Sequence, residues 1–375
     1  MELEFSADQE ALRDAIRAVL TKEAPISLAR AVVEHRGRAD QLWSTMVELG
    51  WPGLTIAESW GGTGLGMVEL GILTEELGRV IAPGPLLTTA SQFVPVVQEL
   101  GTEEQRAHWL GAVASDGCRG TIAIAERGGS FDPTHVTAIV RADGNDIVLS
   151  GEKRFVLEAD DADEIIVVGR EPNSAGADGL AAVVVPASAV RSTALHAVDG
   201  SRSLVDVALE NVRLPASRRL AGATDVARGL QRALETSTVA LALEMVGTAQ
   251  TIFDLTLEYA KHRKQFGVPI GSFQAIKHKF ADMMIALERA RATGYFAALT
   301  IAEDDARRAS ATSVAKAAAG DCQRLLAKEG IQIHGGIGYT WEHDMHLLVK
   351  RLKSSEPLLG SSATHRARIA DLLGV

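Results

Sequence analysis

The sequence predicts an α+β protein in three consecutive parts, with helices at both ends and strands in the middle. Residues 1–115 carry apolar residues at helical spacing, with capping signals before several runs. Residues 116–220 change to short β-branched runs separated by turn residues, which is typical of an all-β domain. Residues 221–375 return to helical spacing. We therefore predict an amino-terminal helical domain, a middle β-barrel or sandwich domain, and a carboxyl-terminal four-helix bundle.

The first part shows local helix signals. Ser6 precedes an apolar stripe at helical spacing, and Thr102 opens the capping-box pattern Thr-Glu-Glu-Gln. Residues 40–50 and 67–78 are predicted to form further helices, the second of them buried. The glycine-rich segment 58–66 could cradle a phosphate. We favour a tight loop, because no strand precedes the segment and it holds no lysine.

The middle and last parts differ in periodicity. The last part includes a run from Asp225 to Phe266 that would be ~60 Å long as one helix. A helix of that length is typical of a bundle, and Gly267 is predicted to end it. Ser272 is predicted to cap the next helix. The strands predicted in the middle part span residues 121–125, 135–140, 147–149, 165–168, 180–185 and 205–209.

Composition excludes several classes of protein. The chain has 375 residues, 46% of them hydrophobic and 23% charged, and its net charge of −10 argues against a non-specific nucleic-acid binder. Its two cysteines, Cys118 and Cys322, lie far apart and indicate neither a zinc site nor a disulfide framework. We expect no bound metal. No signal peptide or membrane-length apolar run is recognised, so we expect a cytoplasmic protein.

Two segments have features suited to a phosphorylated ligand. Lys261 to Lys264 gather cations at a helix end, where the Arg263 guanidinium could grip a pyrophosphate with paired hydrogen bonds. A solvated helix end explains the same pattern equally well. Gly335 and Gly336 would let another molecule approach the backbone closely, although a simple turn between helices fits them too.

The chain resembles the acyl-CoA dehydrogenase family over its whole length. The resemblance rests on RKQFGVPIGSFQAIKH from residue 263, on IQIHGGIGYT from residue 331, and on LGWPGL and EELGR near the amino terminus. It implies an FAD flavoprotein of lipid metabolism in which Arg263, Phe266 and Gln274 contact FAD. By the same resemblance Gln332, Gly335 and Gly336 reach the FAD of a neighbouring protomer. His334, in the same segment, is expected to be structural.

The resemblance also implies an activity and partners. Members of the family oxidise an acyl-CoA to a trans-2-enoyl-CoA and pass the electrons to an electron-transfer flavoprotein. They remove the substrate α-proton with a glutamate while the β-hydride moves to the flavin. A site shared between protomers implies a homo-oligomer, a dimer or a tetramer, or a heterotetramer with a related subunit.

The expected proton acceptor is missing at both positions where the family places it. The position shortly before the last helix is Leu359, and the alternative position on the long helix is Ser237. Neither side chain can act as a base at neutral pH. Glu356 lies three residues before Leu359 and would need a different loop path. Ser361 could keep the hydrogen bond to FAD that a threonine makes in the family.

Glu244 is the remaining weak candidate for the base. It lies two turns after Ser237 in an apolar run, where burial would raise its pKa. Two turns is ~10 Å, which is distant from the expected α-carbon. We favour a structural carboxylate paired with a cation, or one that recognises a polar acyl tail.

The β-domain departs from the family as well. Ala125 replaces the hydroxyl residue expected to meet the flavin, and Leu157 replaces a second one. Phe155 can still stack on the flavin ring. By this resemblance the residues that contact the nucleotide part of FAD are retained, whereas two of the contacts to the flavin ring are lost.

Three functions follow from the resemblance. The first is an acyl-CoA dehydrogenase. The second is a non-catalytic partner subunit of a heteromeric acyl-CoA dehydrogenase, such as those acting on sterol side chains or other bulky acyl groups, in which the related subunit supplies the glutamate. The third is a flavin oxidase or monooxygenase on the same fold, which no feature of the sequence specifically supports.

Overall fold

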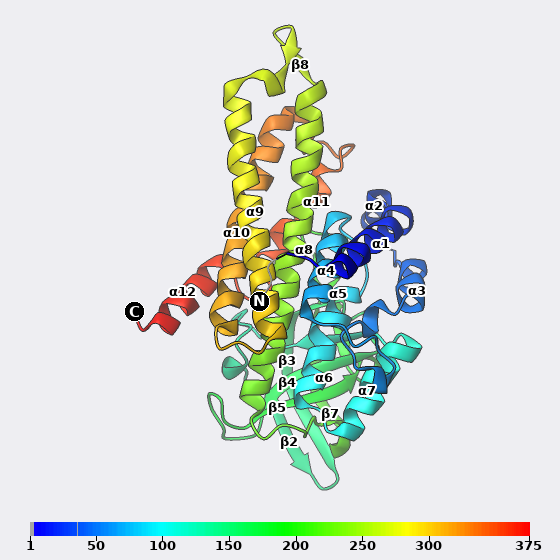
Figure 1. Ribbon diagram of the computed structural model, residues 1–375. Coiled ribbons are helices and arrows are strands. Elements are labelled where there is room, and N and C mark those ends of the chain that lie inside the picture. The colour runs from blue at the N-terminus through cyan, green and yellow to red at the C-terminus, as the bar shows by residue number, and fades with distance from the viewer. Residues whose placement is uncertain (1–3, 36) are drawn as a thin grey trace. The chain divides into compact units, whose positions relative to one another are not determined.

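The computed structural model describes residues 4–35 and 37–375 (Figure 1). The chain folds into two compact units. We call Met1–Gly37, Met67–Pro83 and Thr238–Val375 the bundle unit, and Arg38–Gly66 and Gly84–Ser237 the sheet unit. The amino-terminal helices are therefore distributed over both units. The domain boundaries near residues 115 and 220 remain a prediction.

The bundle unit is built on long helices that run side by side (Figure 1). Helix α8 (Val226–His262) enters this unit at residue 238, and α9 (Gln274–Ala302) and α10 (Arg308–His334) pack against each other. The remaining elements of the unit are α1 (Ala7–Glu23), α2 (Ile26–His35), α4 (Met67–Arg79), β8 (Lys264–Gln265), β9 (Val268–Pro269), η7 (Ile270–Ser272), η8 (Gly335–Tyr339), α11 (Met345–Ser355) and α12 (Ser362–Leu373).

Two glycines allow α4 and α8 to approach closely. A Cβ atom added to Gly78 would lie 2.0 Å from the Glu244 carbonyl oxygen, and one added to Gly247 would lie 1.8 Å from that of Glu75. Neither distance is possible for a real side chain, so any larger residue would separate the helices. The apolar spacing of residues 67–78 correctly predicted a buried helix here.

The end of α8 differs from the prediction. The helix ends at His262, four residues before Phe266, and a small hairpin of β8 and β9 follows. Phe266 and Gly267 form its tip with φ of 53° and 82°, a backbone that suits two-residue hairpin turns. Ser272 does not cap α9, because its hydroxyl donates to the Pro269 carbonyl and Phe273 occupies the N-cap position.

The sheet unit joins helical segments to one β-sheet. Strand order is β1-β4-β2-β3-β7-β6, with β5 paired to β4. The strands are β1 (Gly120–Ala123), β2 (Ile139–Asp143), β3 (Asp146–Leu157), β4 (Glu164–Arg170), β5 (Leu180–Pro186), β6 (Arg191–Ala194) and β7 (Leu204–Pro215). The helical elements are α3 (Asp40–Glu48), η1 (Trp51–Gly53), η2 (Glu58–Trp60), α5 (Leu86–Thr88), the π-helix η3 (Thr89–Phe93), α6 (Val94–Leu100), α7 (Glu103–Asp116), η4 (Pro133–His135), η5 (Ala187–Ala189) and η6 (Ala216–Arg218).

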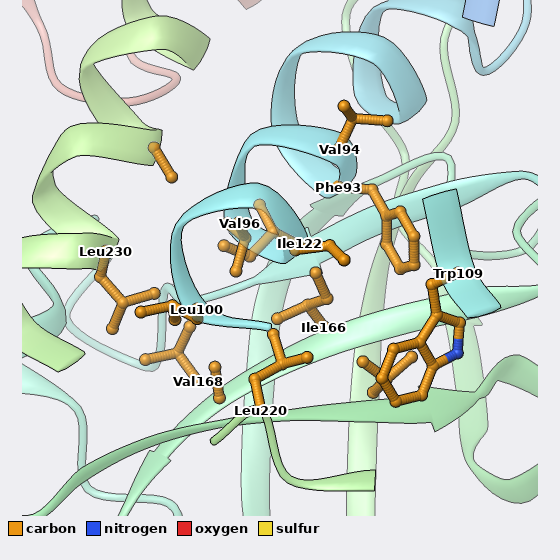
Figure 2. Close-up of a cluster of buried hydrophobic side chains, with 14 of the residues drawn as sticks. Phe93, Val94, Val96, Leu100, Trp109, Ile122, Ile166, Val168, Leu220 and Leu230 are labelled. Carbon is orange, nitrogen blue, oxygen red and sulfur yellow. The ribbon is translucent and has the colours of Figure 1, made fainter. Parts of the chain in front are cut away.

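Strand β4 is buried on both faces. Ile166 and Val168 belong to a core with the helical segments, whereas Ile165 and Val167 belong to a second core among the strands. Figure 2 shows the first core, where Phe93 and other helical side chains lie over the strands. Alternate side chains of a strand point to opposite faces, so one apolar run serves both cores.

Local signals predicted the helix starts at Ser6 and Thr102 correctly and the strand lengths poorly. Thr102 forms the capping box that was expected, and Ser6, expected to precede a capped helix, also forms a complete capping box. Strands β3 and β7 extend well beyond the predicted segments, and neither β6 nor helix α2 was predicted. Residues 135–138 lie outside any strand, and β2 begins at Ile139. Within residues 4–35 and 37–375, no helix has the length and apolar content needed to cross a bilayer.

Candidate cofactor and substrate site

The guanidinium of Arg263 is available at the end of α8. The Arg263 backbone continues the helix through a hydrogen bond to the Tyr259 carbonyl, and its side chain is exposed. Lys261, two residues earlier, is paired with Glu258. Arg263 itself has no side-chain partner among the described residues. Its positive charge is therefore free to bind an external anion.

Phe266 and Gln274 lie close in sequence to Arg263 and are also exposed. Phe266 is 93% exposed at the hairpin tip, which Figure 1 shows beyond the ends of α8 and α9. Its ring meets that of Phe273 edge-on, with 6.1 Å between the centroids. Gln274 is the first residue of α9, and in the part of the chain described its amide has no partner. An aromatic ring this exposed is unusual and is typical of a contact surface.

Gly335 and Gly336 lie where α10 ends. Gly335 has φ of 65°, which favours glycine. Gly336 has no such requirement, and a Cβ atom added there would meet nothing within 4 Å. Nothing within the described chain therefore requires glycine at 336, which fits close approach by a molecule from outside. Gln332, one turn earlier, is also exposed.

His334 is buried beneath this turn. Its ring stacks on Tyr259 with 4.5 Å between the centroids, and its Nδ1 lies 2.8 Å from the Gly330 carbonyl oxygen. Burial lowers the pKa of His334, so the ring is neutral at pH 7 and Nδ1–H donates to that carbonyl. This packing agrees with the structural role expected for His334.

In the sheet unit, Phe155 lies on a strained stretch of β3. Its φ is 56°, and the pairing register of β3 with β7 shifts between Lys153 and Val156. The Arg154 guanidinium lies 5.5 Å from the ring centroid of Phe155. A positive φ at a bulky residue is uncommon and is often found at functional sites. The ring is 37% exposed and so is accessible for stacking.

A buried ion pair holds the loop that begins at Ala125. The Lys153 ammonium is fully buried and donates to Glu126 Oε1 at 2.6 Å and to the Ile124 carbonyl at 3.1 Å. Burial lowers the pKa of Lys153 to about 8. For Glu126 burial acts in the opposite direction, but hydrogen bonds, the strongest from Lys153, bring its pKa below the usual value. Sequence reasoning missed this anchor.

Leu359 and Ser361 lie in a loop between α11 and α12. Leu359 is buried and has φ of 57°. Buried donors hold two backbone carbonyls of this loop, because Lys316 Nζ donates to Gly360 at 2.7 Å and His365 Nε2 lies 3.0 Å from the oxygen of Leu359. Burial lowers the pKa of His365 to about 4, so its neutral ring can donate from Nε2. The loop is thus rigidly positioned around residue 359.

Ser361 and Glu356 are engaged within the same loop. The Ser361 hydroxyl caps α12 by accepting from the Thr364 backbone at 3.2 Å. Glu356 accepts from the backbone and hydroxyl of Ser362 at 2.9 and 2.8 Å. These bonds account for the position of the Glu356 carboxylate, and they make it a structural part of the loop.

The buried Lys316 gives a pH-dependent stability. Burial lowers its pKa to about 8 in the folded protein, below the usual value of 10.5. The unfolded chain therefore binds more protons between these values, so stability rises with pH from about 8 to 10.5. Relative to Lys316→Met, the wild type should gain up to about 3 kcal/mol across this window in urea unfolding.

Lys328→Met serves as the matched control, because Lys328 is an exposed lysine on the same helix. We expect its unfolding free energy to follow the wild-type pH profile. A Lys316→Met difference that does not change between pH 8 and 10.5 would contradict a depressed pKa for Lys316.

Ser237, the second position at which the base was expected, is buried. Its hydroxyl lies 2.6 Å from the Ser91 carbonyl oxygen in the π-helix η3 and 3.0 Å from that of Ala233. Both contacts lie within the sheet unit. Within residues 4–35 and 37–375 the hydroxyl of Ser237 bonds to backbone carbonyls and to no base that would activate it, so it contributes structure and no proton acceptor.

Glu244 forms a buried ion pair. Its Oε1 accepts from Arg351 Nη1 at 2.9 Å, and the two side chains are 2% and 1% exposed. Arg351 also donates to the Ile81 carbonyl at 3.3 Å. A buried carboxylate paired with a buried guanidinium is fixed in place, which suits a structural role. The arrangement matches the structural alternative considered for Glu244.

Comparison with known proteins identifies the family. Three family descriptions match almost the whole chain: "Acyl-CoA dehydrogenase, N-terminal domain" at residues 6–117, "middle domain" at 121–212 and "C-terminal domain" at 227–374. The chain is also 31% identical to acyl-CoA dehydrogenase IpdE2 of Mycolicibacterium smegmatis, covering 95% of this chain and 96% of that protein. The chain belongs to the acyl-CoA dehydrogenase family.

Solved structures agree with this fold. A glutaryl-coenzyme A dehydrogenase in complex with glutaryl-CoA is 25% identical and has a TM-score of 0.92, covering 100% of this chain and 97% of that one. The ChsE4–ChsE5 complex from Mycobacterium tuberculosis contains a chain that is 25% identical with a TM-score of 0.89, covering 100% and 99%. Members of this family bind FAD.

Proposed function

We propose that this chain holds FAD and takes part in the α,β-dehydrogenation of an acyl-CoA thioester to a trans-2-enoyl-CoA, with electrons passed to an electron-transfer flavoprotein. The observation that carries this proposal is the exposed Arg263 guanidinium, which has no side-chain partner among the described residues and lies close in sequence to the exposed Phe266 and Gln274. A second observation supports the proposal: a Cβ atom added to Gly336 would meet nothing within 4 Å, so another molecule can approach this backbone. Bound FAD supplies the acceptor for the hydride that leaves the β-carbon.

In this proposal each exposed group has a defined role. Arg263 holds the pyrophosphate of FAD through charge-assisted hydrogen bonds, and Gln274 and Phe266 complete that contact. Phe155 stacks on the flavin ring. Gln332, Gly335 and Gly336 reach the FAD of a neighbouring protomer, so the protein acts as an oligomer. The Ser361 hydroxyl, already bound to Thr364, adds a hydrogen bond to FAD.

We further propose that the proton acceptor comes from a related subunit. Leu359 and Ser237 occupy the two family positions, and Glu244 is committed to Arg351. These three environments favour a subgroup of the family without its own catalytic glutamate, and hence a partner subunit in a heterotetramer. The similarity to a chain of the ChsE4–ChsE5 complex supports the same proposal. Bulky acyl-CoAs, such as sterol side chains, are the substrates we favour.

Anaerobic flavin reduction by a panel of acyl-CoAs tests both proposals. The chain is purified alone and after co-expression with a related dehydrogenase subunit. We expect slow or absent bleaching by the chain alone, and rapid bleaching by the co-expressed pair. Rapid bleaching by the chain alone would support an independent dehydrogenase. Substrate-dependent peroxide release in air would favour an oxidase, and a chain that binds no flavin in either form would contradict the proposal.

Arg263→Met should weaken FAD binding about 10- to 100-fold, because hydrogen bonds to charged groups contribute about 1.5–3 kcal/mol. The FAD affinity of Arg263→Lys should lie between those of the wild type and Arg263→Met. The lysine keeps the positive charge, but its ammonium cannot form the paired hydrogen bonds. The measurement is the FAD dissociation constant by flavin fluorescence. Lys261→Met removes the same charge two residues away, from a lysine already paired with Glu258. Equal losses in Lys261→Met and Arg263→Met would indicate a general charge effect.

A further inference from the structure

A group of contacts joins α2 to the segment that follows Gly335 and Gly336. We call Arg30, Glu34, Trp341 and Asp344 the clasp. Arg30 binds Asp344 Oδ1 through Nε and Nη2 at 3.1 and 2.7 Å, and it donates to the Trp341 carbonyl at 2.8 Å. The indole Nε1–H of Trp341 donates to Glu34 Oε1 at 3.0 Å. Helix α2 and the segment before α11 can be located in Figure 1.

Further contacts fix the Trp341 ring from α11. The ring stacks on His346 with 4.6 Å between the centroids and an interplanar angle of 26°, and the Lys350 ammonium lies 4.7 Å from its centroid. The hydrogen bond from Trp341 lowers the pKa of Glu34, which keeps that carboxylate ionised near neutral pH. The indole and the backbone carbonyl of Trp341 are therefore both restrained, although the residue is 50% exposed.

The segment between the glycines and the clasp is buried against α10 at Gly338, and the residues on either side of Gly338 are exposed. Ile337 and Tyr339 are 45% and 77% exposed, and Cβ atoms added at Gly335 and Gly336 would meet nothing within 4 Å. Gly335 and Gly336 themselves are therefore held through their neighbours, Gly338 on α10 and the clasp residues beyond it. The turn is bounded on one side by α10 and on the other by the clasp. Removing the clasp contacts would release the backbone that follows Gly336.

From these contacts we infer that the α2 clasp is a positioning device for the Gly335–Gly336 turn, and that it sets how tightly that turn engages the adenine half of FAD. This inference rests on the proposed function. The clasp residues hold Trp341 and Asp344, which follow the turn in the chain, and in this inference they act on the two glycines through the connecting backbone. Because they join residues more than 300 positions apart, they also couple the amino-terminal helices to the cofactor site.

The test compares FAD with FMN, which lacks the adenine half. Dissociation constants for both are measured by fluorescence on the full chain in the assembly that holds flavin. Arg30→Met and Trp341→Phe should raise the FAD constant about 10-fold and leave the FMN constant unchanged. Trp341→Phe retains an aromatic ring for stacking on His346 and removes the indole donor to Glu34. Asp344→Glu, which preserves the charge, should retain more FAD affinity than Asp344→Asn.

Arg307→Met is the control, because Arg307 forms an ion pair with Asp305 at the opposite end of α10. It should leave both constants unchanged. If the clasp variants only lower thermal stability and keep the wild-type ratio of FAD to FMN affinity, the inference is wrong and the proposed function stands. If the wild type binds no FAD in any assembly, the proposed function fails and the inference fails with it.

Discussion

Leu359→Glu is expected to accelerate anaerobic flavin reduction by an acyl-CoA about 10²- to 10⁴-fold, the usual contribution of a positioned general base. The substitution supplies a carboxylate at the position where the resemblance to the family predicts the proton acceptor. Lys316 and His365 hold the backbone on both sides of this side chain. An introduced carboxylate therefore starts from an ordered loop. Stopped-flow absorbance of the flavin-loaded chain, purified without a partner, measures the rate.

Leu359→Gln is the matched control, because glutamine has the shape of glutamate and accepts no proton at neutral pH. It should reduce flavin no faster than the wild type. Equal rates for the Glu and Gln variants, in protein that binds FAD and acyl-CoA, would show that position 359 does not face the substrate α-carbon. A fast wild-type reaction without a partner would show that another group is already the base.

Glu244→Gln is expected to lower the free energy of unfolding by about 3–5 kcal/mol, because it leaves the Arg351 charge buried without its carboxylate. The rate of flavin reduction per folded, flavin-loaded protomer should not change. Urea unfolding gives the first quantity and stopped-flow reduction, with the co-expressed subunit present, gives the second. The two measurements separate a structural carboxylate from a catalytic one.

The double variant Glu244→Met with Arg351→Met tests the same pair in a different way. Replacing both charges by apolar groups of similar length should recover most of the lost stability, since a buried ion pair stabilises little compared with a well-packed apolar pair. If Glu244→Gln instead keeps its stability and loses reduction about 100-fold or more, Glu244 is the base and the partner-subunit proposal is wrong.

Local interactions were predictable from the chain alone. The capping boxes at Ser6 and Thr102 involve residues three positions apart, so their geometry follows from the sequence. The exposed cation at Arg263 and the glycine turn at 335 and 336 were also visible as patterns. The hairpin after His262 was missed, because Phe266 adopts a positive φ that bulky residues rarely take.

Distant pairings could not be predicted in this way. Arg351 neutralises Glu244 from 107 residues away, and Lys316 binds carbonyls about 40 residues further along the chain. The sequence does show Lys316 among small apolar residues of a helix, which indicates burial. It does not show which carbonyls the lysine contacts. The pairing of Arg30 with Asp344 joins the two ends of the chain.

By itself, then, the sequence determined the succession of helical, β and helical parts, the family, and the absence of a carboxylate at positions 237 and 359. Only the tertiary structure decided which charges are already neutralised and which remain free for a ligand. The physical reason is that periodicity and capping act over a few residues, whereas burial and ion pairing depend on contacts that folding creates between distant segments.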